Sequence, residues 1–233
     1  MTTLYNSFEE HEQVWLALPS ANLQMAKKTF PKWRELGYKI AVVCPDRYSN
    51  EYSSLVDLKV LESEIGGYKG WPNAVNHLSK QLTKYDIIIA AGDDMHPDPN
   101  YKAHELRLQF VRHFGGTFGV MQPYGDKFGS MACETCEQIC GSAWLGKEFR
   151  ERIYEGKGPM WEGYWHMWAD TELYQVATKY NCLWIRGDLS QFHEHRLRGS
   201  HNFVPSIPSG NKHIAEKLYR ERKQNNFPNS NPL

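Results

Sequence analysis

Short apolar runs recur along the chain, and segments with helical spacing separate most of them. Such runs, bounded by turn residues, are typical of strands buried on both faces of a sheet. The predicted strands are 14–18, 40–44, 58–61, 85–91, 118–121 and 183–185. The predicted helices are 23–36, 71–82, 169–180 and 212–223, and 143–154 begins as a strand and continues as a helix. This alternation predicts an α/β protein with a mostly parallel central sheet and helices on both faces.

Local signals refine both ends of the chain. Ser20 or Asn22 can cap the first helix, and Gly37 can end it. Pro31 lies inside that helix and predicts a kink or break near Thr29, because proline lacks the backbone donor that the helix needs. The segment 225–233 is rich in Asn and Pro. We therefore expect one domain over 1–224 and a loose tail.

Composition narrows the class of protein. Lys+Arg and Asp+Glu number 27 each in 233 residues, so the formal net charge is zero, which disfavours a strongly basic nucleic-acid binder. No apolar stretch reaches the roughly 18 residues of a membrane span. Residues 1–12 lack the basic and apolar regions of a signal peptide. The five cysteines are an odd count, unlike a secreted disulfide framework, so we expect a cytoplasmic chain with reduced thiols.

Two adjacent carboxylates, Asp93 and Asp94, close the most hydrophobic predicted strand. Ligands of open α/β sheets bind outside the carboxyl ends of strands. Carboxylate oxygens there suit Mg²⁺ or Mn²⁺, and such an ion can neutralise a diphosphate. A solvated turn or a helix cap is the alternative interpretation of the same pair.

The segment 87–101 joins an apolar strand, an acidic cluster, prolines and an aromatic residue, and it resembles the DXD-type strand end of GT-A fold glycosyltransferases, in particular the family-2-like group. Downstream, 141–145 resembles the acceptor-side segment, 169–173 the "ED" motif, and 192–196 the histidine-containing segment of that family. Upstream, 18–20, Asp46, and Lys69 with 73–76 extend the resemblance, which covers roughly 14–196. The sequence departs from the family pattern at Ala91 and Ala169, where acids are common.

The resemblance implies a GT-A-like fold and metal-assisted sugar transfer from a nucleotide-sugar donor, with UDP as the expected nucleotide, Mn²⁺ or Mg²⁺ as the cofactor, and inversion at the anomeric carbon. Asp94, Asp93 and His193 would bind the metal, and Asp170 would be the general base, although Asp170 can equally cap its helix. The expected donor-site residues are Pro19, Ser20, Asp46, Lys69 and Asp93. The expected acceptor or sugar contacts are Trp168, Trp165, Gly141, Ser142, Glu172, His195 and Arg196.

The acceptor stays open between a saccharide, a small molecule and a hydroxymethylated base in phage DNA. The DNA hypothesis depends on 212–223, which carries five Lys/Arg against two Glu, and on Arg196, Arg198 and His201. A nucleotidyltransferase with paired Asp and Mg²⁺ is the alternative enzyme. It is less favoured because 18–23, after the first strand, has neither glycine nor a basic residue.

Two further patterns have both a functional and a structural interpretation. Cys133, Cys136 and Cys140 have C-x₂-C-x₃-C spacing, which suits either a zinc-stabilised, non-enzymatic binding module or three buried thiols on one helix face. Trp161, Trp165 and Trp168 would share a face if their segment were helical. They would then form a stacking platform for the acceptor or pack in the core.

Overall fold

A computed structural model describes residues 10–126, 138–195 and 211–233, with the side chains of 211 and 212 left out. Within these ranges a seven-stranded sheet has the order β3-β2-β1-β4-β6-β5-β7. The strands are β1 (Val14–Pro19), β2 (Lys39–Cys44), β3 (Leu58–Leu61), β4 (Ile87–Ala90), β5 (Val120–Pro123), β6 (Ala143–Gly146) and β7 (Leu183–Arg186). Only β6 runs antiparallel to its neighbours β4 and β5. The predicted α/β class with a mostly parallel sheet is confirmed.

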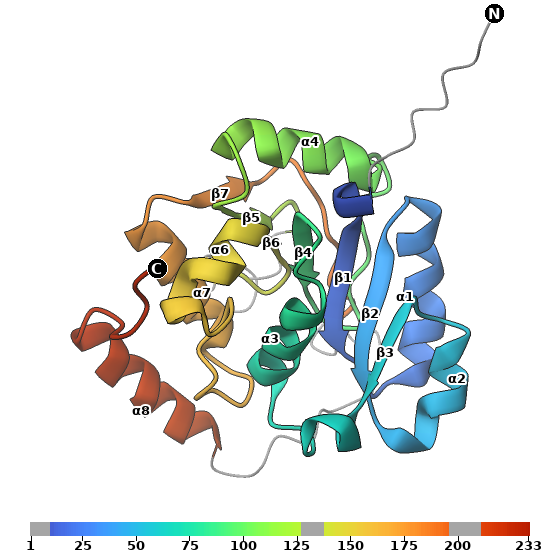
Figure 1. Cartoon of the computed structure of the whole chain (residues 1–233), viewed down its shortest axis with the longest axis horizontal. Coiled ribbons are helices and arrows are strands. Elements are labelled where there is room, and N and C mark those ends of the chain that lie inside the picture. Colours follow the sequence, from blue (N-terminus) through green and yellow to red (C-terminus); the bar gives the residue numbers. More distant parts are fainter. Residues whose placement is uncertain (1–9, 127–137, 196–210) are drawn as a thin grey trace, which may run out of the picture.

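Helices cover both faces of the sheet (Figure 1). The helices are α1 (Leu23–Glu35), α2 (Ser49–Ser53), α3 (Trp71–Gln81), α4 (Ala103–Phe114), α6 (Lys147–Arg152), α7 (Ala169–Lys179) and α8 (Asn211–Gln224). Short 3₁₀ turns occupy Glu10–Glu12, Asp46–Tyr48, Glu62–Ile65 and Ile153–Gly156. None of these helices combines the length and the apolar character that crossing a bilayer requires, as judged over the described ranges.

Strand alternation divides the core into two layers. On β1, Leu16 and Leu18 face a cluster that α1, α2 and α4 cover, whereas Trp15 and Ala17 face the cluster under α3, α6, α7 and α8. Successive side chains of a strand point to opposite faces, so a strand buried on both sides needs apolar residues at every position. This explains why the strand runs are continuous rather than alternating.

The first helix differs from expectation at Pro31. Asn22 is the cap, because its side chain accepts the Met25 amide at 3.2 Å. The predicted break near Thr29 is wrong, since α1 runs unbroken to Glu35. Pro31 lies on the exposed side of the helix, while its neighbours Phe30 and Trp33 are fully buried against the sheet. Packing of that buried face outweighs the single hydrogen bond that proline removes.

The C-terminal segment also differs from expectation. The loose tail predicted for 225–233 is instead packed on α6 and α7. Phe227 is buried beside Tyr219, the Leu233 amide donates to the Arg152 carbonyl at 2.9 Å, and the Tyr180 hydroxyl donates to Asn231 at 2.8 Å. Apolar and backbone contacts therefore order a segment whose composition resembles a linker.

Candidate active site at the carboxyl edge of the sheet

The sheet order changes direction between β1 and β4, since β2 and β3 follow on one side of β1 and β4 lies on the other. At such a switch point the two following loops separate, which leaves a crevice at the carboxyl ends of the strands. Ser20 follows β1 directly, and Asp93 and Asp94 follow β4. The predicted acidic turn therefore lies where α/β sheets bind ligands.

Asp93 fastens the ends of β1 and β4 together. Its Oδ2 accepts the Ser20 hydroxyl at 2.7 Å and the Asn22 amide at 3.2 Å, next to the start of α1. Ser20 is itself buried and lies 2.6 Å from the Tyr52 hydroxyl. This carboxylate thus occupies a helix N-terminus, where the helix dipole favours negative charge. The arrangement gives Asp93 a structural use, and Asp94 is the carboxylate of the pair that contacts His193.

Asp94 forms a pair with His193, whose Nε2 lies 3.2 Å from Oδ2. Burial would raise the pKa of Asp94, but the hydrogen bond and charge of His193, with the more distant charge of His195, hold that pKa below its usual value. The backbone is fixed too, because the Glu194 amide donates to the Asp94 carbonyl at 2.8 Å. An ionised carboxylate and an imidazole from segments far apart in the sequence therefore converge.

The side chains of 193–195 alternate between two sides, beginning at His193, which forms an antiparallel bridge with Met95. The rings of His193 and His195 lie 4.8 Å apart on one side, while Glu194 points to the other. Glu194 accepts from His96 at 2.7 Å and from Lys28 of α1 at 2.5 Å. Hydrogen bonds from α1 also hold the loop after β4, through Thr29 to the Asp93 carbonyl and Trp33 to the Met95 carbonyl. The face opposite the histidines thus anchors the segment to the fold.

Asp170 is the second residue of α7 and is half-buried. One carboxylate oxygen accepts the Thr171 amide at 2.8 Å, but the helix cap that the sequence left open is wrong, because the N-cap of α7 is Trp168 and no side chain caps it. Burial raises the pKa of Asp170, and the charge of His166 opposes this. Burial lowers the pKa of His166, and the charges of Asp170 and Asp94 oppose this. His166, which belongs to none of the predicted motifs, therefore interacts electrostatically with both candidate carboxylates.

The tryptophan segment is not a helix, so the predicted shared face of Trp161, Trp165 and Trp168 is wrong. Residues 161–168 are irregular, and each ring has its own partner. Trp161 lies under the Arg222 guanidinium, Trp165 packs edge-on against Tyr68, and Trp168 stacks on Tyr219. Gly163 lies against the Trp161 ring, since a Cβ there would be 2.5 Å from the indole nitrogen. No common stacking platform results.

Two predicted sugar contacts are buried in the fold. Glu172 is fully buried and binds Arg222, Tyr154 and Tyr164. Ser142 is buried and exchanges hydrogen bonds with Gln122, while its carbonyl accepts from Gln191. Because their polar atoms are bonded and their side chains are buried, neither residue can contact a sugar in this structure. Gly141 is exposed, and Arg196 lies outside the described residues.

The predicted donor-side residues are spread along the sheet edge. Pro19 ends β1 beside Ser20. Asp46 is exposed after β2 and accepts both the amide and the hydroxyl of Ser63, which lower its pKa. Lys69 is exposed in the loop before α3. The end of that loop fits tightly against the tryptophan segment, since a Cβ on Gly70 would lie 2.2 Å from the Trp165 carbonyl oxygen.

The cysteine cluster falls mostly outside the description, because Cys133 and Cys136 belong to the residues left out. Cys140 is fully buried, and burial raises the pKa of its thiol well above the usual value. Within 10–126, 138–195 and 211–233, no group of three or more His, Cys, Asp or Glu side chains could hold a metal ion. The predicted set Asp93, Asp94 and His193 therefore does not form such a three-ligand group, whereas the zinc hypothesis falls mostly on residues outside these ranges.

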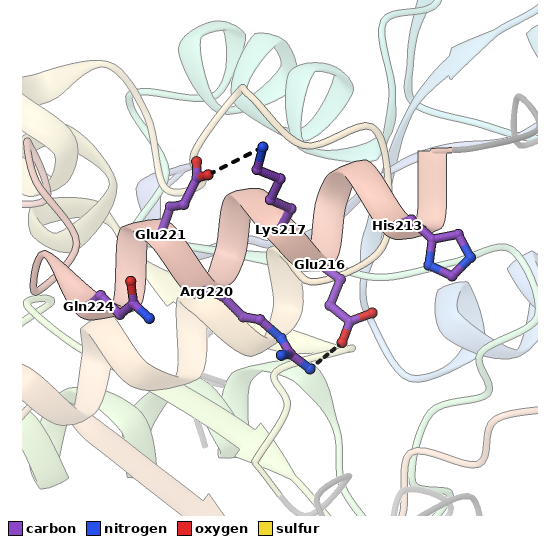
Figure 2. Close-up of a pocket in the computed structure, with 6 residues that line it drawn as sticks. All are labelled: His213, Glu216, Lys217, Arg220, Glu221 and Gln224. Atoms are coloured by element: carbon purple, nitrogen blue, oxygen red, sulfur yellow. Dashed lines mark hydrogen bonds and ion pairs between the residues drawn. The ribbon is translucent and has the colours of Figure 1, made fainter.

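The outer face of α8 carries charges that neutralise one another. Figure 2 shows its shallow pocket, where Arg220 pairs with Glu216 at 2.6 Å and Lys217 approaches Glu221 at 3.8 Å. Arg222 turns inward to Glu172. Three of the five cations counted along 212–223 are thus paired, which weakens the predicted basic patch for a phosphate backbone.

Comparison with known proteins adds no identification. A scan against protein-family models finds no match, and a search of curated proteins finds no significant similarity. The functional assignment therefore depends on the geometry of the site and on the sequence resemblance.

Proposed function

We propose that this protein is a metal-assisted glycosyltransferase that uses a nucleotide-sugar donor. The observation that carries the proposal is the convergence of Asp94 and His193 at the switch point of the sheet. The charges of Asp170 and Asp94 both act to raise the pKa of His166, which supports placing Asp170 at the same site. A mostly parallel sheet covered on both faces is in keeping with the GT-A-like fold that the sequence resemblance implies. Pro19 lies at the same edge of the sheet and would contact the donor nucleotide, whereas Ser20 is buried and its hydroxyl is bonded to Asp93 and Tyr52.

Asp94 and His193 at this edge of the sheet fit a divalent cation bound together with its substrate. Mg²⁺ is usually held by one or two protein ligands, with water and substrate phosphates completing its shell, so a site of two ligands is sufficient. Asp94 would supply an ionised oxygen and His193 a nitrogen, and Mn²⁺ accepts both kinds of atom. The cation would neutralise charge on the departing diphosphate.

Asp170 would act on the acceptor. As the acceptor oxygen attacks the anomeric carbon, its hydroxyl proton passes to the Asp170 carboxylate, and the bond between that carbon and the diphosphate oxygen breaks. The nucleoside diphosphate leaves, and the configuration inverts. A carboxylate whose pKa is raised by burial is a stronger base than an exposed one, which suits this step. The pairing of Lys217, Arg220 and Arg222 with glutamates favours a saccharide or small molecule over DNA as the acceptor.

The structure does not favour the alternative, a nucleotidyltransferase. The loop after β1 is short. Its Ser20 hydroxyl and Asn22 amide donate to Asp93, and the Asn22 side chain accepts the Met25 amide at the start of α1. A nucleotidyltransferase would need that loop to cradle a triphosphate with free amides and a basic side chain.

A thermal-shift experiment tests the donor site. A nucleoside diphosphate such as UDP, at about 100 times its Kd, should add about 2.7 kcal/mol of stability and raise Tm by roughly 5–10 °C. We expect most of this increment only with Mn²⁺ present, and Asp94→Asn should remove the metal-dependent part. Asp188→Asn, a carboxylate paired with Arg186 beside the edge strand β7, is the matched control and should leave it unchanged. An equal increment in Asp94→Asn and the unmodified chain would contradict the metal assignment.

A further inference from the structure

Two residues that flank Asp170 in the sequence, Trp168 and Glu172, both contact the helix α8. Downstream, Arg222 binds Glu172 through two hydrogen bonds of 2.7 and 2.8 Å. Both side chains are buried, and the tyrosines 154 and 164 donate to the same carboxylate at 2.9 and 2.8 Å. The parallel geometry of a guanidinium on a carboxylate fixes direction as well as distance. Glu172 belongs to the first turn of α7, two residues after Asp170.

The upstream contact is aromatic. The ring of Trp168, two residues before Asp170, stacks on Tyr219 of α8 with centroids 4.8 Å apart and planes inclined by 21°. Trp168 has a φ of +73°, a left-handed conformation that bulky residues rarely adopt. Its carbonyl nevertheless accepts the Glu172 amide at 2.9 Å and so begins the helix. Strained backbone of this kind persists only where surrounding contacts hold it, and the Tyr219 ring is such a contact.

We propose that α8 is a positioning element for Asp170, with Tyr219 and Arg222 as its positioning residues. This inference rests on the proposed function, in which Asp170 is the general base. The charge of Arg222 is matched by Glu172, so Arg222 acts on Asp170 through geometry. A 1 Å displacement of a catalytic group can cost about 100-fold in rate. A strained turn followed by a half-buried carboxylate needs an anchor on each side to avoid such displacement.

Stability alone is a weak explanation for the Arg222–Glu172 pair. Removing two charges from water costs desolvation free energy, and apolar residues of similar volume often stabilise a protein equally well or better. What an apolar pair lacks is the directional bonding of the guanidinium. The pair is therefore better explained by the orientation that it imposes on the start of α7.

Hydrogen–deuterium exchange tests the anchoring without any assay of activity. Two amides report on Asp170: Cys140, which donates to the Asp170 carbonyl at 3.1 Å, and Glu172, which donates to the Trp168 carbonyl. Tyr219→Leu should speed their exchange by about tenfold, because a stacked aromatic pair contributes about that factor to a local opening. Tyr219→Phe keeps the ring and should leave exchange unchanged. Val60→Ala, on the distant edge strand β3, is the control for a general loss of stability.

Steady-state kinetics then distinguishes a displacement of Asp170 from a general loss of stability. At a temperature where all variants are folded, Tyr219→Leu and Arg222→Lys should lower kcat for sugar transfer by roughly 10- to 100-fold with the donor KM unchanged. Val60→Ala should retain kcat. Equal exchange at Cys140 and Glu172 in Tyr219→Leu and Val60→Ala, or full kcat in Tyr219→Leu, would overturn the positioning role. Faster exchange in Tyr219→Leu alone, with no transfer by the unmodified chain, would uphold the anchoring and count against the glycosyltransferase proposal.

Discussion

Asp170→Asn is expected to lower the turnover number for sugar transfer by about 10²–10⁴-fold, the range that a positioned general base contributes. The amide cannot take the proton that the acceptor hydroxyl loses. It keeps the size of the carboxylate, and its carbonyl oxygen can still accept the Thr171 amide, so the start of α7 should stay intact. Steady-state kinetics with a sugar-nucleotide donor and a hydroxyl acceptor measures the effect.

Donor binding provides the internal control for this variant. Because Asp170 is assigned to the acceptor, the Mn²⁺-dependent rise in Tm with a nucleoside diphosphate should match that of the unmodified chain. Near-normal turnover in Asp170→Asn would refute the assignment of the base and leave Asp170 a structural use, through its bond to the Thr171 amide. Loss of nucleotide binding together with turnover would instead move Asp170 to the donor side.

Glu172→Ala should destabilise the folded chain by about 3–5 kcal/mol, because it leaves the Arg222 guanidinium buried without its countercharge. The two tyrosine hydroxyls that donate to Glu172 also lose their acceptor. Urea denaturation, read as a lower midpoint at unchanged slope, measures the loss.

Two further variants distinguish the charge from the packing. Glu172→Gln retains the hydrogen-bond acceptor without the charge and should fall between Glu172→Ala and the unmodified chain. Replacing both Glu172 and Arg222 with Met should recover most of the stability, since no unpaired charge remains. A loss below about 0.5 kcal/mol in Glu172→Ala would show that the pair is exposed to water in solution and would contradict its buried position.

The sequence predicts elements well wherever burial on both faces makes a strand uniformly apolar. Each of the seven strands corresponds to a predicted run, including the strand and helix that share 143–154. The helix α4 was missed. Its buried positions Ala103, Leu106 and Phe110 have helical spacing, but the buried Arg107 interrupts the apolar pattern by pairing with Asp86 at 2.6 Å. A buried charge whose partner lies far away in the sequence leaves no recognisable pattern in the residues around it.

The same limit applies to the site. Asp93, Asp94 and Asp170 could be placed from the sequence, because the end of a strand and the start of a helix are local features. The use of Glu172 could not, since its partner Arg222 lies 50 residues away and approaches only when α8 packs on α7. No motif in the sequence marks His166, which is distinguished only by its place four residues before Asp170. The tail 225–233 was misjudged because its composition does not reveal that Phe227 is buried.

The central claim is that Asp94 and His193 hold a divalent cation against the diphosphate of a donor. Proton NMR of the histidine side chains during a Mn²⁺ titration, with and without a nucleoside diphosphate, tests it directly, because bound Mn²⁺ broadens nearby resonances. His113 near the end of α4, where its ring stacks on Trp184, serves as the internal control. We predict that substoichiometric Mn²⁺ with the nucleotide broadens His193 first and His195 next, with His113 unaffected. Uniform broadening of all three, or a sharp His193 signal at saturating Mn²⁺ and nucleotide, would contradict the account.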